Sequence, residues 1–367
     1  MNQQGDFWLG FSMSPGIGPK TFGQLLRNFG SAKKAWTAEG SKLENILKPA
    51  LTSKFLNFRK NFDLEKYKKQ LRQQKISFIT QVDKEYPKLL RQIPNPPIVL
   101  YIKGDPKLLD IKSRKIAIVG TRHITSYGRQ ITEMFAGELA HSGLVIVSGM
   151  ALGVDGVAHS SCIDVGGKTI AVLGNGVDTP YPRENEKLYE QILDSGGLIL
   201  SEYPPGTPPS AGSFPARNRI VAGLSSGILV TEGAADSGSL ITANFGLEFG
   251  RKVFAVPGPI TSSLSKAPLD LIAKGARLVT SPEDILKEFS ISNSQFSNKT
   301  KNTKFKTENK EEQEILKILE NESLQFDEIA RKTKIDSSKL GSILSMMEIR
   351  GMIKSTESGN FSIAAKI

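Results

Sequence analysis

The chain has little cysteine, histidine and tryptophan. Of its 367 residues, one is cysteine, three are histidine and two are tryptophan. The single cysteine, Cys162, excludes an internal disulfide framework and a cysteine-rich zinc site, and we expect it to be a small buried residue on a helix. The histidines, His123, His141 and His159, share no spacing typical of metal ligands. We therefore predict no metal site.

Long apolar runs are lacking as well. No stretch approaches the roughly 18 consecutive apolar residues that a membrane-spanning helix needs. The first residues lack the basic start and apolar stretch of a secretory signal. What is present is a globular composition, 39% hydrophobic and 23% charged, in a chain long enough for two or three domains. We expect a cytoplasmic protein with no membrane anchor.

The formal net charge of +11 is unevenly distributed. Residues 1–110 hold 19 Lys and Arg against 9 Asp and Glu, a net charge of +10. Residues 111–287 hold 16 of each sign, and residues 288–367 hold 13 basic against 12 acidic residues. Two interpretations fit a basic flank: attraction to a polyanion, or a solvated face that serves solubility.

Residues 1–110 are predicted to form a small basic helical domain with a helix-hairpin-helix turn. The segment Gly16 to Lys20, followed by Phe22 and Leu25, is typical of a helix-hairpin-helix turn. Such a turn either directs backbone N–H groups at a DNA phosphate or only connects two helices. The proline-rich run at 93–97 closes the region, because proline cannot continue a helix.

Residues 111–287 alternate short apolar strands with amphipathic helices, the pattern of a parallel sheet with crossover helices. Because these strands are almost wholly apolar, we expect them to be buried on both faces. The pattern predicts a Rossmann-like α/β domain. The expected strands are 116–119, 144–147, 169–173, 198–200, 228–230, 253–256 and 277–279.

A polar stretch at 288–310, rich in Ser, Asn, Lys and Thr, is interpreted as a linker. Residues 311–367 then suit a winged-helix domain. Because its third helix offers only Lys339 and Arg350 as cations, we expect it to contact protein rather than read a DNA groove. The expected elements are helices at 311–320, 326–333 and 337–350, and a hairpin at 352–364.

Small residues follow several strands of the predicted sheet: Gly120 to Arg122 after the first, Ser148 and Gly149 after the second, and Ser237 to Ser239 beyond the fifth. The carboxyl ends of parallel strands meet at one edge of the sheet. Glycine lets a ligand approach the backbone, hydroxyls donate to oxyanions, and helix N-termini favour negative charge. The sequence therefore predicts a backbone-lined anion site, in which we expect a phosphate group.

No cofactor motif fits its structural context. Gly174 to Gly176 lacks the third glycine of a dinucleotide-binding turn, and Pro180 disrupts the helix that should follow. Gly167 to Thr169 resembles the end of a phosphate-binding loop but precedes a strand instead of a helix. Gly223 to Gly227 fits a nucleophile elbow by letters but lies between a helix and a strand, the reverse of the required order. We predict no cofactor.

Acidic residues keep an enzymatic alternative open. Asp155 and His159 are one helical turn apart, and we interpret them as a helix cap and a packed neighbour rather than an acid–base pair. Glu202 and Glu232 each follow a strand, so they are candidates to meet across the site.

The segment from Ser213 to Ser225 places Phe214 beside Arg217 and Arg219. Pro215 suits the first turn of a helix. Arginine binds phosphate oxygens through its planar fork and an aromatic ring stacks on a base, which is what single-stranded nucleic acid requires. The alternative is a surface helix of ion pairs with Phe214 in the core.

The chain resembles the DNA-processing protein A family (DprA, also called Smf) through nearly all of residues 86–285. The resemblance implies a non-enzymatic cytoplasmic protein with an N-terminal sterile-alpha-motif-like or helix-hairpin-helix domain and a C-terminal winged helix. It further implies that the protein binds incoming single-stranded DNA during natural transformation, forms homodimers and loads RecA recombinase. The motifs that carry it include Gly120-Thr121-Arg122, Ser148-Gly149-x-Ala151-x-Gly153-x-Asp155, Tyr181-Pro182, Phe214-Pro215-x-Arg217-Asn218-Arg219-Ile220, Ser237-Gly238-Ser239 and Val253-Phe254-Ala255-Val256-Pro257-Gly258.

Transferred motif by motif, the resemblance implies a set of DNA-contacting residues at the strand ends and on the helix after Pro215. Three positions depart from the family: Asp236 stands where a basic residue is common, Gly233 replaces an alanine, and 262–268 lacks a Gly-x-Asn form. The implied contacts are Gly120, Thr121, Arg122, Ser148, Gly149, Phe214, Arg217, Arg219, Ser237, Gly238 and Ser239.

An alternative function is a nucleotide phosphoribohydrolase of the lysine-decarboxylase-like group, which shares the Rossmann-like core. Glu232 is then the candidate catalytic acid. The hallmark Pro-Gly-Gly-x-Gly-Thr-x-x-Glu is missing, however, and the chain has Glu232 to Ser239 at the corresponding place. Since the core is electrically neutral, we also expect DNA binding to depend only weakly on salt there, with the basic N-terminal region adding affinity.

Overall fold

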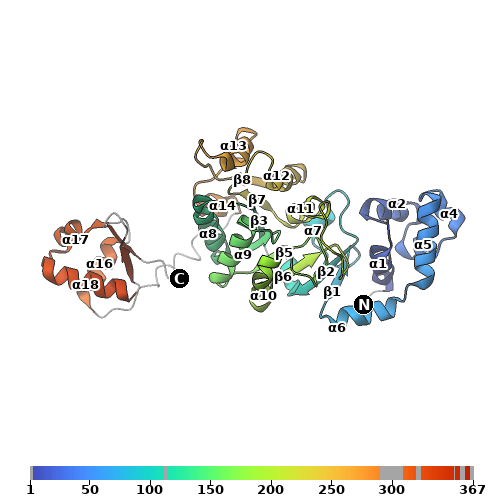
Figure 1. Cartoon of the computed structure of the whole chain (residues 1–367), viewed down its shortest axis with the longest axis horizontal. Helices are drawn as coiled ribbons and strands as arrows, with labels where there is room; N and C mark the ends of the chain where they lie inside the picture. Colours follow the sequence, from blue (N-terminus) through green and yellow to red (C-terminus); the bar gives the residue numbers. More distant parts are fainter. Residues whose placement is uncertain are drawn as a thin grey trace. The chain divides into compact units, whose positions relative to one another are not determined.

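The computed structural model describes residues 3–110, 114–289, 309–319, 324–350, 352–355 and 360–363. The chain divides into two compact units, Met1–Ile291 and Ser292–Ile367 (Figure 1). The first unit holds the N-terminal helices and a large sheet with helices on both faces. The second unit is small and carries its own sheet.

A nine-stranded sheet organises the first unit, in the order β1-β2-β6-β5-β4-β3-β7-β8-β9. Pairing is parallel from β6 through to β9 and antiparallel between β1, β2 and β6. This confirms the Rossmann-like α/β core. The parallel strands, each within a residue or so of its expected place, are β3 (Lys115–Val119), β4 (Val145–Ser148), β5 (Thr169–Val172), β6 (Leu198–Ser201), β7 (Gly227–Val230), β8 (Lys252–Ala255) and β9 (Arg277–Leu278).

Two strands of the sheet lie in the region expected to be a separate helical domain. β1 (Ser77–Thr80) and β2 (Val99–Gly104) both precede residue 110, and β2 pairs with β6. The sheet therefore begins at Ser77, and the boundary expected at residue 110 falls after its first two strands. The sequence pattern did not reveal β1 and β2, because the prediction was based on strands linked by crossover helices. Antiparallel strands need no such crossover, and here only the short α7 (Lys88–Arg91) lies between them.

The N-terminal helices pack onto this sheet. α1 ends at Met13 and α2 begins at Pro19, so a turn joins these helices, and Ile17, Phe22 and Leu25 are buried beside it. The same buried cluster includes Tyr101 of β2, whose hydroxyl lies 2.8 Å from that of Ser12. The helices are therefore part of the first unit's core. They are α1 (Gln3–Met13), α2 (Pro19–Phe29), α3 (Ala32–Thr37), α4 (Gly40–Glu44), α5 (Pro49–Asn61) and α6 (Leu64–Gln73).

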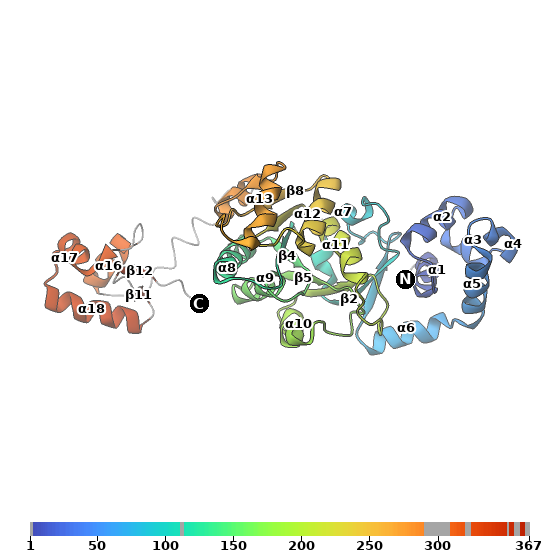
Figure 2. The same cartoon turned by 45° about the horizontal axis from the view of Figure 1, so that its top comes forward.

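Helices cover both faces of the sheet, because successive residues of each strand point to opposite sides. In β3, Ala117 packs on one face and Ile118 on the other. The first face is covered by α7, α11 (Ser213–Leu224), α12 (Gly238–Glu248) and α13 (Lys266–Ala273). The opposite face is covered by α8 (Ser126–His141), α9 (Val154–Asp164), α10 (Glu186–Asp194) and α14 (Pro282–Glu288) (Figure 2).

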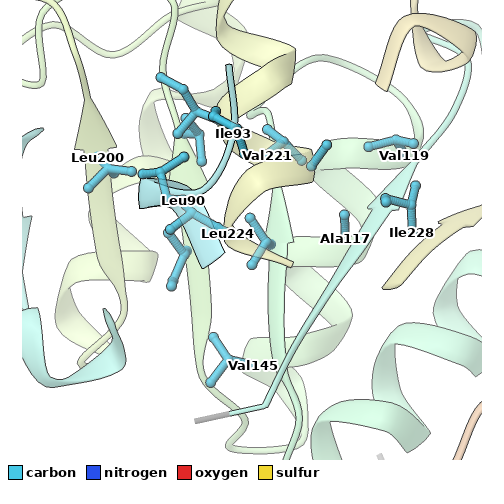
Figure 3. Packing of buried hydrophobic residues seen from close by; sticks show 14 of the residues in the cluster. Leu90, Ile93, Ala117, Val119, Val145, Leu200, Val221, Leu224 and Ile228 are labelled. Carbon is cyan, nitrogen blue, oxygen red and sulfur yellow. The ribbon is translucent and has the colours of Figure 1, made fainter. Parts of the chain in front are cut away.

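The position of α11 is fixed by close packing against the segment around α7. Figure 3 shows the side chains of Leu90 and Ile93 beside those of Val221 and Leu224. Gly223 permits this approach, since a Cβ there would lie 2.7 Å from Cδ1 of Leu90. Burial of this many aliphatic groups holds the helix that carries Phe214 and Arg217 at its other end.

The second unit has the winged-helix fold that the sequence predicts. Its three strands pair in the order β10-β12-β11. Most of the expected linker lies outside the described residues. The elements are α16 (Lys310–Leu319), β10 (Leu324–Gln325), α17 (Phe326–Thr333), α18 (Ser337–Ile349), β11 (Ile353–Ser355) and β12 (Asn360–Ile363). In the described part of both units, no helix is long and apolar enough to cross a membrane.

Candidate nucleic-acid interface

A groove of about 810 Å³ lies at the carboxyl ends of the parallel strands. It sits beside β3, which pairs with β4 on one side and β7 on the other. The strands β4 to β6 lie on one side of β3, and β7 to β9 lie on the other. Open α/β sheets bind ligands at such a reversal of strand order. The predicted contact residues that line it are Gly120, Thr121, Arg122, Gly149, Phe214, Arg217, Ser237, Gly238 and Ser239.

Two predicted contacts lie outside the groove lining. Ser148 is fully buried, and its hydroxyl donates to the carbonyl of Ile118 at 2.7 Å. Arg219 forms an ion pair with Glu202 at 2.5 Å, with only 14% and 9% of the two side chains exposed. The sequence alternative of an ion-pair helix is therefore right for Arg219, although Arg217 two residues earlier has a different environment.

Arg217 lies in the groove wall, where its Nη1 and Nε atoms donate hydrogen bonds within the protein. The guanidinium donates to the backbone carbonyls of Gly149 and Val172, and its Nε donates to the side chain of Asn218. Burial lowers the pKa of Arg217 to about 10, which leaves it charged near neutral pH. Arg217 thus joins α11 to the ends of β4 and β5.

Asp155 and Asn185, in addition to Arg217, hold the turn after β4. Oδ2 of Asp155 accepts the N–H groups of Gly149 and Ala151 at 3.1 and 3.2 Å. Asn185 donates to the carbonyls of Met150 and Ala151 at 2.9 and 3.1 Å. Met150 has a φ of 64°, an unusual value for a residue other than glycine. These amides are thus already used by Asp155, and less backbone faces an anion than the sequence predicts.

Gly149 has a packing role that the sequence did not reveal. A Cβ at this position would lie 2.5 Å from a guanidinium nitrogen of Arg217. The missing side chain therefore makes room for the arginine, in addition to any ligand that approaches from the groove.

Glu232 is buried beside the start of α8, and both oxygens of its carboxylate accept hydrogen bonds. Its carboxylate accepts the N–H of Thr125 at 2.9 Å and the hydroxyl of the same residue at 2.6 Å. A carboxylate at a helix N-terminus is favoured by the helix dipole. Since Glu202 pairs with Arg219, the two acids do not meet across the site. This arrangement gives Glu232 a structural role.

Asp155 and His159 also have structural roles, as interpreted from the sequence. Asp155 binds the turn after β4 rather than capping its own helix, whose N-cap is Gly153. Nδ1 of His159 lies 2.6 Å from the hydroxyl of Thr169. Burial lowers the pKa of His159 to about 3, so the ring is neutral and is not poised for proton transfer at physiological pH.

The side chains left available to a ligand gather around Phe214. The guanidinium of Arg122 lies over the Phe214 ring, 5.8 Å from its centroid. Tyr181 stacks on the same ring, with the centroids 5.4 Å apart and the planes 24° apart. Beyond this pair lies an adjoining chamber of about 630 Å³, at which Arg183 is exposed. No ion pair is found for Arg122 or Arg183 in residues 114–289, which the structure describes.

Tyr181 and Arg183 were missing from the predicted set of contacts. The signal available was the Tyr181-Pro182 pair in the family resemblance, directly before a basic residue. Their loop follows β5. Because Tyr181 and Phe214 are far apart in the sequence, the sequence alone did not indicate that their rings are in contact.

The opposite wall of the groove is polar and mixed in charge. Ser237 caps α12, with its hydroxyl 2.8 Å from that of Ser239. Gly238 is exposed, and a Cβ built there would have no neighbour within 4 Å. Asp236 lies in the groove lining, at a position where family members commonly have a basic residue. Its carboxylate is exposed and repels a phosphate group. This wall offers hydroxyls and an accessible backbone, but no cation.

Comparison with known proteins agrees with this architecture. The family described as DNA recombination-mediator protein A matches residues 77–290, so the match begins at the first residue of β1. The DprA winged helix domain matches residues 301–359. Protein Smf of Synechocystis sp. is 40% identical over 289 residues, which cover 78% of this chain and 72% of that protein. DNA processing protein DprA of Bacillus subtilis is 46% identical over 226 residues, which cover 62% and 75%.

Solved structures give the same relationship. The X-ray structure of DNA processing protein A from Streptococcus pneumoniae matches with a TM-score of 0.68 and 36% identity, over 77% of this chain and 97% of that one. DNA processing protein A from Helicobacter pylori, described for its single-stranded DNA binding mode, matches with a TM-score of 0.52 and 35% identity, over 58% and 95%. The chain therefore belongs to the DprA/Smf family of DNA recombination-mediator proteins.

Proposed function

We propose that this recombination mediator binds single-stranded DNA in the groove at the strand ends. The observation that carries the proposal is the cluster of Arg122, Phe214 and Tyr181 beside the exposed Arg183. Single strands expose base faces and phosphates together, and aromatic rings with neighbouring arginines bind both. In a duplex the base faces are stacked inside, so the rings have no partner.

The finer parts of the function rest on the family. We infer that the protein acts in the cytoplasm during natural transformation, forms homodimers, and loads RecA recombinase onto the bound strand without a chemical step of its own. The occupied carboxylate of Glu232 supports a binding function over the alternative phosphoribohydrolase. Release of ribose phosphate from nucleoside monophosphates by the purified protein would contradict this part.

The proposed function predicts a clear preference for single strands. In fluorescence-anisotropy titrations with labelled oligonucleotides of equal length, we expect a much lower Kd for single-stranded than for double-stranded DNA. Adding the protein to strands coated with a single-strand-binding protein is expected to speed RecA filament assembly. Equal affinity for the two forms of DNA would contradict the proposed site, whereas slow RecA assembly with intact DNA binding would contradict only the loading step.

We further propose that the basic N-terminal region adds affinity for the same strand. Deleting residues 1–110 does not test this idea, because it removes β1 and β2 from the sheet. Charge can be removed without touching the core at four lysines exposed on α3 and α6: Lys33, Lys34, Lys66 and Lys69.

Replacing these four lysines with glutamine is expected to weaken single-strand binding severalfold at low salt, because fewer counterions are released. The slope of log K against log salt is expected to become shallower by up to about 0.7 for each phosphate that the protein no longer neutralises. Replacement by arginine at the same positions keeps the charge and serves as the control. If the glutamine variant keeps both the affinity and the slope, the N-terminal charge serves solubility alone.

A further inference from the structure

We propose that Tyr181, rather than Phe214, presents the base-stacking face of the groove, and that the chamber beside it holds one unstacked nucleobase of a single strand. The inference rests on the proposed function and assigns a subsite within it. It starts from how the two rings are covered. Phe214 contacts the Arg122 guanidinium and the Tyr181 ring, and it is half-buried. Tyr181 is 40% exposed.

The exposed face of Tyr181 borders the chamber that lies beyond the Phe214 pair. Leu152, which is 38% exposed, lines the same chamber, together with Pro180 and Pro182. The Tyr181 ring and the Leu152 side chain together give this hollow an exposed apolar patch, the kind of surface at which ligands bind. A flat, largely apolar ligand that covers them both is energetically favoured.

The charges around the chamber indicate which flat ligand fits. Arg122 and Arg183 both line it, and in the described residues 114–289 neither takes part in an ion pair. Glu184 is the one acidic residue of the lining. An apolar surface with two guanidinium groups at the same chamber matches a base and its neighbouring phosphates. An uncharged aromatic metabolite would leave both arginines without a partner.

The loop that holds Tyr181 is well supported for this role. Asn175, three residues beyond β5, donates to the carbonyl of Thr179 at 2.7 Å. Asn185, two residues beyond Arg183, donates to the carbonyls of Met150 and Ala151 and so fixes the end of the loop to the groove floor. Phe214 backs the Tyr181 ring from α11. A ring fixed in this way loses little conformational entropy when a base stacks on it.

The test separates binding of bases from binding of backbone. Two oligonucleotides of the same length are compared by anisotropy, oligothymidylate and a strand made of abasic residues. We expect Tyr181→Ala to lower the affinity for oligothymidylate about tenfold or more, on the scale of one base–aromatic stack, and to leave the affinity for the abasic strand within about twofold. Tyr181→Phe keeps the ring and is expected to retain the preference for thymidylate.

Three outcomes would overturn the inference. An equal loss for both strands would mean that Tyr181 supports the groove rather than a base. No loss for either strand would mean that the chamber is not a subsite. A tenfold loss in Tyr181→Phe would assign the effect to the hydroxyl instead of the ring. If the unsubstituted protein binds neither strand, the proposed function itself fails. If it binds and Arg122→Ala weakens the binding of both strands while Tyr181→Ala has no effect, the groove is confirmed and this subsite alone fails.

Discussion

Arg217→Met is expected to lower the free energy of unfolding of the first unit by about 3 kcal/mol. Arg217 is 5% exposed, and its guanidinium donates to the carbonyls of both Gly149 and Val172. Methionine fills a similar volume but leaves these two buried acceptors unpaired, and each costs roughly 1–3 kcal/mol. It also leaves the carboxylate of Asp155 without its nearby positive charge.

Thermal unfolding followed by circular dichroism checks the prediction, with an expected fall in Tm of about 6 to 12 °C. Arg129→Met is the matched control, because Arg129 is exposed on α8 and contacts only Glu133, at 3.7 Å. Single-strand affinity is expected to fall as well, since the turn after β4 loses one of its three supports. The salt dependence of binding distinguishes this from a phosphate contact. An unchanged Tm with a shallower salt slope would assign Arg217 to DNA instead of to the fold.

The parallel part of the fold could be predicted because its signals are local. The run Ile116 to Val119, for example, is wholly apolar and is followed by glycine, which is typical of a strand buried on both faces. β1 carries no such signal. Its residues Ser77, Phe78 and Ile79 are partly exposed at the sheet edge, and its partner β2 comes after a proline-rich turn. Pairing of such a strand depends on tertiary packing rather than on its own sequence.

The site was predicted less completely, because side-chain partners depend on the fold. The family resemblance implied that Arg217 and Arg219, on one helix, both contact DNA. In the structure the first arginine faces the strand ends and the second faces Glu202, as residues two apart on a helix must differ in direction. Similarly, Gly149 was interpreted as a point of ligand approach, whereas its close neighbour is Arg217.

A further consequence concerns charge. Asp155 and Glu232 satisfy amides and a helix N-terminus that the sequence assigned to an incoming phosphate. Carboxylates of the protein itself thus occupy these positions. The affinity for DNA must therefore depend on the few basic side chains that have no acidic partner. Among the predicted contacts, Arg122 is the arginine with an exposed side chain, whereas Arg217 and Arg219 are largely buried.

Arg122→Ala is accordingly expected to have the largest effect on DNA affinity of any single substitution in the groove. Loss of its charge-assisted hydrogen bonds to phosphate should weaken single-strand binding by about 1–3 kcal/mol, or roughly 5- to 150-fold, without sequence preference. The side chain is exposed, so Tm should remain unchanged. The salt slope should become shallower by about 0.7, the value for one phosphate on a single strand.

Anisotropy titrations over a series of salt concentrations measure both quantities in one experiment. Arg122→Lys keeps the charge but not the planar fork that lies over Phe214, and it is expected to recover the slope with only part of the affinity. Arg129→Ala removes an exposed arginine outside the groove lining and controls for net charge. If Arg122→Ala and Arg129→Ala weaken binding equally, the groove contributes only general electrostatic attraction. A selective loss in Arg122→Ala would instead assign the phosphate contact to the ring cluster at the strand ends.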